Sequence, residues 1–160
     1  NPLAGYTPAA VRLAAGARVT GGLATARYTA TLARTAAHEV RGIHALADTL
    51  EFEGTAQDTA QCEFRSLVGD RQRYFYARSS RTVQDVRLLK DRSVNPWPLS
   101  GRIAWVLVTD RLRSNRRTDV EWQIDGVAVL TFDGTATPEL VVNGTFRYRV
   151  NLATGALTVP

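Results

Sequence analysis

The stretch NGTFRYRVNL, residues 143–152, alternates large apolar and polar side chains without a break. Aromatic and aliphatic residues take one side and arginines take the other: Phe146, Tyr148, Val150 against Arg147, Arg149. Because successive side chains of a strand point to opposite faces of a sheet, this pattern predicts a half-buried β-strand behind an Asn-Gly turn. The pleat alone accounts for both arginines, and the alternation also helps to specify strand register.

The same pattern runs through the C-terminal half of the chain. From Ile103 to Val108 both sides are apolar, which predicts a central strand covered on two faces. Val120, Trp122 and Ile124 alternate with acidic and amide side chains, which predicts a strand with one wet face. Closely spaced turn signals favour an antiparallel meander and leave no room for crossover helices. The signals are Asp125-Gly126, Asp133-Gly134, Asn143-Gly144 and Ala153-Thr154-Gly155.

The N-terminal half predicts a mixture of strands and short helices. Strands are expected at residues 24–32, 50–53, 61–67 and 73–78, with a hairpin turn at 68–70. Apolar residues spaced by three and four predict one helix over residues 35–49, with Thr35 as its N-cap. The same spacing predicts a second helix over residues 81–92, which Pro96 and Pro98 would stop.

The fold expected from these elements is mainly β. We predict an antiparallel meander that forms a sandwich or barrel, with one or two short helices laid across it. Residues 1–20 are rich in alanine, glycine and proline and predict an extended N-terminal arm. Residues 21–160 are expected to form a single β domain, since 160 residues is the usual size of one domain.

Composition limits the function classes. The chain has 44% hydrophobic residues, a net charge of +5 and a pI near 10.0. Of its twenty basic residues only Lys90 is lysine, which is typical of a GC-rich genome, and the charge predicts attraction to anionic surfaces. The single cysteine, Cys62, excludes a disulfide within the chain. Since the sequence starts at Asn1 without a basic and then apolar leader, we expect a mature exported chain.

No residue pattern predicts catalysis. His38 and His44 lie six residues apart, whereas a helical zinc-protease motif needs histidines four apart. Carboxylate pairs such as Glu51 with Glu53 fit solvated strand faces better than acid–base chemistry. Phosphate-binding loops and hydrolase signatures are missing from the sequence. We therefore predict no enzyme activity, no cofactor and no metal ligand.

Two sets of residues are candidates for binding. Arginines in the hairpin DRLRSNRRTD and in the last long strand are candidates for contact with a partner: Arg111, Arg113, Arg116, Arg117, Arg147 and Arg149. Aromatic residues on strands and in one loop are candidates for lining a ligand site: Trp97, Trp105, Trp122 and Tyr148. The stretch from Arg71 to Arg78 interleaves arginines with aromatic residues, for which core packing with a solvated edge is the simpler interpretation.

The ending LTFDGTATPELVVNGTFRYRVNLATGALTVP resembles the tails of uncharacterised exported β-rich proteins and lipoproteins of GC-rich bacteria. Its shared features are a strand ending in phenylalanine, two Asn/Asp-Gly-Thr turns and a final Y-x-x-x-L-x-T-G hairpin. The resemblance covers about the last sixty residues. It implies an envelope, periplasmic or extracellular location and no particular activity.

Three functions are compatible with the sequence. The leading hypothesis is a non-enzymatic exported structural or interaction protein, either a repeating subunit of a surface assembly or an accessory subunit of an envelope complex. Its partners would be other protein subunits, including copies of itself. The first alternative is a β-barrel module that holds a small apolar ligand. The second is arginine-mediated binding of nucleic acid or another anionic surface.

Overall fold

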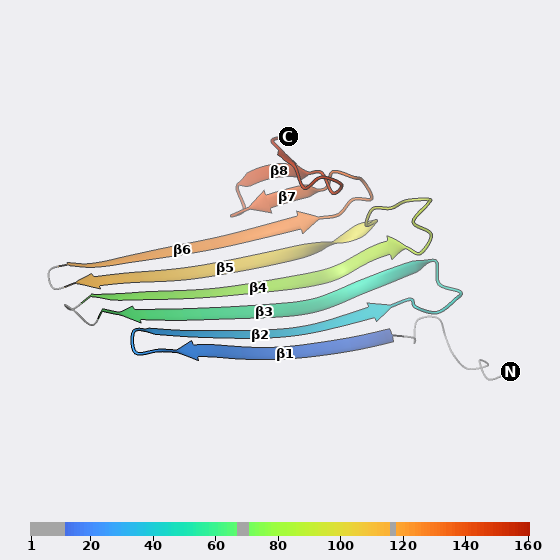
Figure 1. Ribbon diagram of the computed structural model, residues 1–160. Coiled ribbons are helices and arrows are strands. Elements are labelled where there is room, and N and C mark those ends of the chain that lie inside the picture. Colours follow the sequence, from blue (N-terminus) through green and yellow to red (C-terminus); the bar gives the residue numbers. More distant parts are fainter. Residues whose placement is uncertain (1–11, 67–70, 116–117) are drawn as a thin grey trace.

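The structure, a computed structural model, describes residues 12–66, 71–115 and 118–160 (Figure 1). These residues form nine strands: β1 (Arg12–Ala24), β2 (Tyr28–Arg41), β3 (Thr49–Arg65), β4 (Gln72–Leu89), β5 (Ser100–Asn115), β6 (Thr118–Thr131), β7 (Glu139–Val142), β8 (Phe146–Val150) and β9 (Leu157–Thr158). Each strand pairs with the next in an antiparallel sense, so the order in the sheet is the order in the chain. The predicted antiparallel meander is confirmed.

The six long strands lie side by side in a single layer, and the short strands curl over one end of it (Figure 1). Short turns join several of the neighbouring strands. At the β1–β2 turn the Thr25 hydroxyl accepts hydrogen bonds from the backbone N–H groups of Arg27 and Tyr28. At the β7–β8 connection Asn143 and Gly144 take positive φ angles of 51° and 69°, and the Thr145 N–H donates to the Val142 carbonyl oxygen at 3.1 Å, as in a type I′ turn.

Both predicted helices are wrong, because residues 35–41 belong to β2, residues 42–48 form the β2–β3 connection and residues 81–89 belong to β4. Thr35, the predicted cap, lies in the middle of β2, opposite Arg18 of β1 and Gln57 of β3. The second segment lies mostly in β4. Neighbours on both sides satisfy the backbone groups of these segments, and this tertiary pairing overrides the weak helical spacing. Strand β2 ends where the chain turns at Gly42, whose φ is +76°.

The predicted turn at Asp125-Gly126 is also wrong, since both residues lie inside β6. Asp125 pairs with Val108 and Gly126 with Leu107, so the strand passes straight through the Asp-Gly pair. The structure places Asp133-Gly134 and Ala153-Thr154-Gly155 between strands, as the sequence predicted. The predicted turn at residues 68–70 lies outside the described residues. The strands on either side of it are β3 and β4.

The register gives the sheet two chemically different faces. Residues that pair across antiparallel strands point to the same face. One row runs from Leu32 through Ala60, Ala77 and Thr109 to Ile124. We call the face that carries this row the apolar face. The opposite face, which carries the row of Thr35, Gln57, Ser80, Val106 and Val127, is called the polar face.

A β-bulge bends the sheet near one end. The register shifts by one residue between Phe52 and Gly54 on β3 and between Gln84 and Arg87 on β4. Asp85 lies in the bulge with a φ of +50°. Gly101 of β5 makes room for it, because a Cβ at this position would meet the Asp85 carbonyl oxygen at 2.4 Å. The bulge therefore re-aims the end of β4 towards the C-terminal part of the chain.

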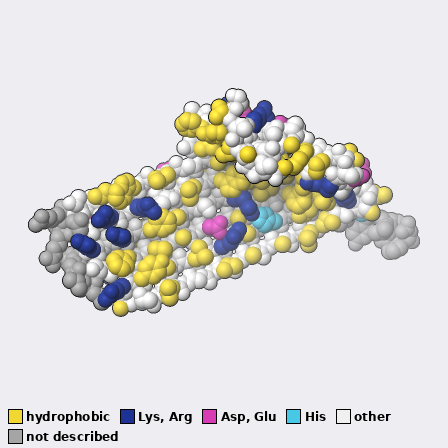
Figure 2. Space-filling view, turned by 45° about the horizontal axis from the view of Figure 1, so that its top comes forward, with side chains coloured by type: hydrophobic (Ala, Val, Ile, Leu, Met, Phe, Trp, Pro, Cys, Tyr) yellow, Lys and Arg dark blue, Asp and Glu magenta, His cyan; other side chains and the backbone are white. Residues whose placement is uncertain are grey.

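The core is small and lies at this bent end. Residues 133–160, which we call the C-terminal lobe, fold over the apolar face there (Figure 2). Val86, Leu130 and Phe132 are buried beneath the lobe, which contributes Leu140 and other side chains, and Pro138 is fully buried. Further partly buried residues pack around this cluster: Phe52, Val83, Ile103, Trp105, Val150 and Leu152.

The predicted sandwich or barrel is wrong, since the strands form one sheet whose edge strands, β1 and β9, remain apart. A compact protein of 17.5 kDa exposes about 7900 Å², whereas this chain exposes 11102 Å². Strand β5 is central, as predicted, but Val106 and Leu107 on its two faces are exposed. Residues 12–20 of the predicted arm are part of β1 and pair with β2.

Candidate interaction surfaces

The apolar face is uncovered beyond the C-terminal lobe. Hydrophobic side chains are spread along this face between the lobe and the far end of the long strands (Figure 2). Leu32 is 53% exposed, Trp122 47% and Ile124 60%. Leu32 lies on β2 and the other two on β6, with Ala60, Ala77 and Thr109 in the row between Leu32 and Ile124. Exposed large apolar side chains gathered on one face mark interaction sites in proteins that are otherwise well folded.

Aromatic residues and arginines share two rows at the far end of this face. One row runs Tyr28, Phe64, Arg73, Arg113, Val120, and the next runs Ala30, Cys62, Phe75, Arg111, Trp122. Each row crosses five strands and spans about 19 Å. We call the seven aromatic and basic residues of these rows the arginine–aromatic platform: Tyr28, Phe64, Phe75, Trp122, Arg73, Arg111 and Arg113.

Contacts within the platform are few. The Arg111 guanidinium lies over the Phe75 ring, 5.5 Å from its centroid, in a cation–π geometry. The Tyr28 hydroxyl donates a hydrogen bond to the Cys62 sulfur at 3.3 Å, and this bond raises the pKa of Tyr28. Among the described residues, none of Arg73, Arg111 and Arg113 forms an ion pair with a carboxylate. Their positive charges are therefore available to a partner.

Charge is divided between the two faces at this end of the sheet. The carboxylates of β5 and β6 all fall on the polar face: Asp110, Asp119, Glu121 and Asp125. On the apolar face, the described acidic residue of the long strands is Asp58, which pairs with Arg34 at 3.3 Å. The apolar face of the platform therefore has a positive local field, and the reverse side has a negative one.

The second candidate surface is the open edge of β1. This strand has one neighbour, β2, among the described residues, and all thirteen of its residues are exposed. Most of its side chains are small, and the charged ones are Arg12 and Arg18. Proteins usually protect an edge strand with proline, a bulge or inward-pointing charge, because the unpaired backbone groups can bind another strand. Strand β1 has neither proline nor a bulge.

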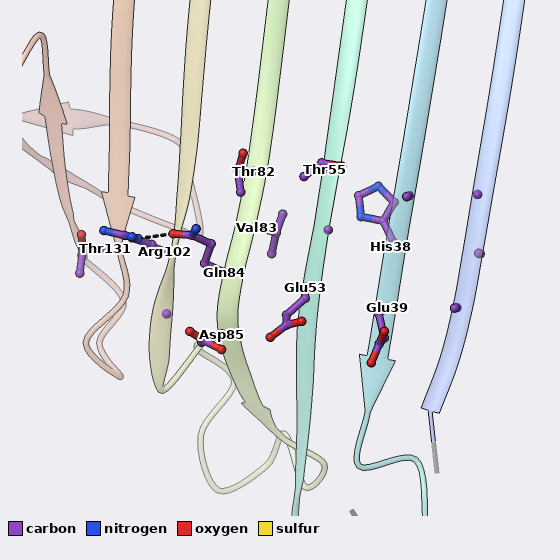
Figure 3. A pocket seen from close by; sticks show the side chains of 16 residues that line it. His38, Glu39, Glu53, Thr55, Thr82, Val83, Gln84, Asp85, Arg102 and Thr131 are labelled. Carbon is purple, nitrogen blue, oxygen red and sulfur yellow. Dashed lines mark hydrogen bonds between the residues drawn. The ribbon is translucent and has the colours of Figure 1, made fainter. Parts of the chain in front are cut away.

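A hollow of 1050 Å³ crosses the sheet near the bulge and is lined from β1 to β6 (Figure 3). Its lining includes Glu39, Glu53 and Asp85, together with Arg102. Oxygens of Glu51, Glu53 and Asp85 lie within 4.8 Å of one another. Glu53 pairs with Arg41 at 3.4 Å and Glu51 with Arg87 at 3.2 Å. Arginines therefore balance two of these three carboxylates.

Glu39, which lines the hollow, does not have the raised pKa that a general acid needs. Glu39 accepts a hydrogen bond from Arg41 at 2.7 Å, and Arg12 lies 3.4 Å from its other oxygen. The hydrogen bond from Arg41 is the main reason why the pKa of Glu39 is lowered. A carboxyl group that donates a proton at neutral pH needs a raised pKa instead. Glu39 thus acts as the centre of an ion-pair network.

The predicted partner-binding arginines separate into three groups. Arg111 and Arg113 lie on the platform, whereas Arg116 and Arg117 fall outside the described residues. Arg147 forms an ion pair with Glu139 at 2.9 Å, and Arg149 forms one with Asp133 at 3.4 Å. The C-terminal pair therefore already has partners within the lobe, and the described arginines of this set that have no ion pair are Arg111 and Arg113 of β5.

The predicted ligand-lining aromatic residues lie in different surroundings. Trp97 is in the β4–β5 connection, where Asn95 accepts a hydrogen bond from its backbone N–H. Trp105 packs against the core, and Tyr148 lies opposite Leu140 in the lobe. Trp122 is exposed on the platform. None of these four aromatic residues lines the 1050 Å³ hollow.

Sequence reasoning missed Tyr28 and Phe64 as members of a site. The alternation of Arg73 with Phe75 was visible, and the register confirms that these two share a face. The neighbours of β4 in the sheet are set by pairing between residues that are distant in the sequence. A local pattern of residues does not reveal these neighbours. Aromatic residues near the hairpin ends of adjacent strands were the signal that could have found the platform.

Asp133 holds the start of the lobe in place and gives a pH-dependent prediction. Its carboxylate accepts hydrogen bonds from the Thr135 hydroxyl at 2.6 Å and from the Thr135 N–H at 3.1 Å, which with Arg149 lower its pKa. A lowered pKa in the folded state stabilises the fold above the ordinary value of 3.8, and this stabilisation is lost as the pH falls further. We expect Asp133→Asn to lower the melting temperature by about 2–4 °C at pH 7.

The same comparison at low pH serves as the control. The difference in melting temperature between Asp133→Asn and the parent chain should shrink below pH 4, where the parent carboxyl becomes protonated as well. Differential scanning calorimetry across this range measures it. A difference that stays constant from pH 7 to the acid limit would mean that the charge of Asp133 contributes nothing.

Comparison with models of known protein families, with curated proteins and with solved structures finds no match. Among the described residues there is no helix of sufficient length and hydrophobicity to cross a lipid bilayer. The candidate surfaces therefore have to be interpreted from their own geometry and chemistry.

Proposed function

We propose that this chain is a non-enzymatic structural protein that pairs with a second copy of itself through the open edge of β1. The observation that carries this proposal is the long, fully exposed β1 strand, which has small side chains and few charges. On the other side of the sheet, β9 has two residues, and the part of β6 that lies before its pairing with β7 at Ala128 is a second open edge. That edge carries Asp119, Glu121 and Asp125, and charges of this kind protect an edge from pairing. Two β1 strands that pair about a two-fold axis give a closed dimer rather than a filament, because the same edge is used by both copies.

The side chains of β1 are compatible with antiparallel pairing to another β1. If Ala17 of the two copies lies at the two-fold axis, Arg18 of one copy faces Gly16 of the other. In the same register Arg12 faces Gly22, so no arginine lies directly opposite another. Like charges directly across strands would be destabilising, and small residues leave room for the arginine side chains.

Such a dimer forms one continuous sheet from the long strands of both copies. Because paired residues in antiparallel strands share a face, the two apolar faces lie on the same side of the dimer. An exported location and a role in a surface or envelope assembly, both expected from the sequence, belong to this proposal. The alternative of a small apolar ligand inside a barrel loses its enclosing wall, because the sheet is open.

Light scattering on the purified chain tests the proposal. We expect a mass of twice 17.5 kDa at both low and high salt, since backbone hydrogen bonds between strands do not depend on ion pairs. Adding charge to β1 with Thr20→Lys and Gly22→Lys should give the monomer mass, because these lysines would add to the positive charge of Arg12 and Arg18 across the edge.

The matched control places the same two lysines one strand further in. Thr29→Lys and Thr31→Lys lie on β2, on the same face as the edge variants, with Thr31 directly beside Gly22. This control should remain dimeric. A monomeric parent chain, or dissociation by the β2 lysines as complete as by the β1 lysines, would refute pairing through β1.

A further inference from the structure

We propose that the arginine–aromatic platform docks the sheet on an anionic phospholipid surface. This inference goes beyond the edge pairing proposed above and concerns a different surface, so either can fail without the other. It starts from the separation of charge between the two faces. Arg73, Arg111 and Arg113 lie on the apolar face without carboxylate partners among the described residues.

The platform has the residue types that bind the interface of a bilayer. Tryptophan and tyrosine concentrate at the level of the lipid headgroups, where one end of the side chain is apolar and the other is wet. Trp122 is exposed at one border of the platform and Tyr28 at the other. Arginines between them would contact lipid phosphates, for which the planar guanidinium gives two parallel hydrogen bonds.

Aliphatic residues continue from the platform along the same face. Leu32 and Ile124 lie in the next row, and Leu107 lies one row further. All three are exposed. Burying apolar side chains among acyl chains adds to the attraction between arginines and anionic headgroups, and the combined effect holds an amphipathic surface at a membrane.

These aliphatic rows distinguish a lipid from a nucleic acid. A single-stranded nucleic acid needs bases stacked on aromatic rings and a basic groove that follows its backbone. The row beside the platform is mainly aliphatic, with Leu32, Ala60, Ala77 and Ile124 around Thr109, whereas the row of Leu107 also holds the ion pair of Arg34 with Asp58. The Phe75 ring is already covered by Arg111. A charged backbone would gain nothing from the aliphatic surface, whereas a bilayer covers it.

Edge pairing through β1 would strengthen binding to the membrane. In the proposed dimer both platforms face the same side, so two clusters of three arginines could meet one flat membrane. Two linked sites bind more tightly than one because the second contact is intramolecular. The lobe also lies on this side of the sheet and leaves the far end of the long strands accessible (Figure 2).

Co-sedimentation with vesicles tests the proposal. Vesicles of equal parts phosphatidylglycerol and phosphatidylcholine should bind the chain, and vesicles of phosphatidylcholine alone should bind it far less. Arg111→Gln with Arg113→Gln should weaken partitioning about twenty-five-fold, from roughly fivefold for each arginine near an anionic surface. Binding should also weaken as salt rises. Tryptophan emission should shift to the blue on binding, and Trp122→Phe should remove most of that shift.

The matched control removes two arginines from the other face at the same end of the sheet. Arg65→Gln with Arg78→Gln changes the net charge equally, but both residues lie on the polar face. This variant should keep most of the binding. Equal loss in both double variants, equal binding to neutral vesicles, or tighter binding to a single-stranded oligonucleotide than to the anionic vesicles would overturn the proposal.

Discussion

Replacing Phe132 by alanine is expected to lower the free energy of unfolding by about 3–5 kcal/mol, the usual cost of removing a buried phenylalanine. Phe132 is 8% exposed and belongs to a core cluster whose other buried members, among the residues that the structure describes, are Val86 and Leu130. A domain of this size is stable by about 5–15 kcal/mol in total. The loss should therefore detach the C-terminal lobe or unfold the chain.

Urea unfolding followed by tryptophan fluorescence measures this effect, because Trp105 packs against the same cluster. Phe146→Ala is the matched control, since it removes the same side chain from a site that is 57% exposed. We expect the control to cost less than about 1 kcal/mol. Similar costs for the two variants would mean that residues 133–160 do not pack on the apolar face as described.

Replacing Gly101 by alanine is the second change with a large expected effect. The residue has a φ of +100°, which side-chain-bearing residues rarely adopt. Its new Cβ would lie 2.4 Å from the Asp85 carbonyl oxygen and 2.5 Å from the Val86 Cα. Both atoms are backbone and cannot rotate away. Backbone strain alone costs about 1–3 kcal/mol, and the overlap adds to it, so the bulge should be lost or rearranged.

Gly126 provides the control for this substitution. It also lies within a long strand, but a Cβ there would meet nothing within 4 Å. Gly126→Ala should be neutral or stabilising by about 0.5–1 kcal/mol, because alanine restricts the unfolded chain. Chemical denaturation of both variants gives the comparison. A Gly101→Ala chain as stable as Gly126→Ala would contradict the geometry of the bulge.

The strands were predictable where alternation is strict and the turns are short. Phe146, Tyr148 and Val150 fall on one face of β8 as the sequence indicates, and the turn at Asn143-Gly144 lies just before this strand. In these segments the local pattern and the pairing partner lie close together in the chain. Little information beyond turn chemistry is then needed to place them.

The two false helices show where the local pattern fails. Val40 and Ile43 have helical spacing, yet Val40 pairs with Phe52 across a hairpin that the spacing does not reveal. Alanine-rich strands such as β2 carry weak propensities of their own, so the neighbouring strands decide their structure. The prediction at Asp125-Gly126 was wrong for the opposite reason. Its local turn signal is strong, yet the pair lies inside β6, which is held in place by pairing with β5.

The open sheet could not be predicted from alternation either. A strand with one apolar side fits a closed barrel, a sandwich or an open layer equally well. The difference lies in what covers the apolar face, and here the lobe covers only one end. The platform could not be predicted for the same reason. Tyr28 and Trp122 lie far apart in the sequence, and four successive strand pairings place them on one face.

Together the edge and the platform describe a sheet that gains stability and contacts from outside the chain. Strand β1 offers backbone groups to a second copy, and the arginine–aromatic platform offers charge and apolar surface to anionic lipid. Both proposals account for exposed features that a self-sufficient domain would cover. The two proposals together describe a dimer whose single continuous sheet lies on an anionic lipid surface.

Hydrogen exchange of the β1 amides, followed by NMR, tests the central claim most directly. In an unpaired edge strand every second N–H group points away from β2 and exchanges freely with solvent. In the proposed dimer the outward N–H groups of the paired segment bond to the second copy, so protection should extend to consecutive residues on both sides of Ala17. Alternating protection along β1, with fast exchange at every second residue around Ala17, would contradict the pairing of two β1 strands.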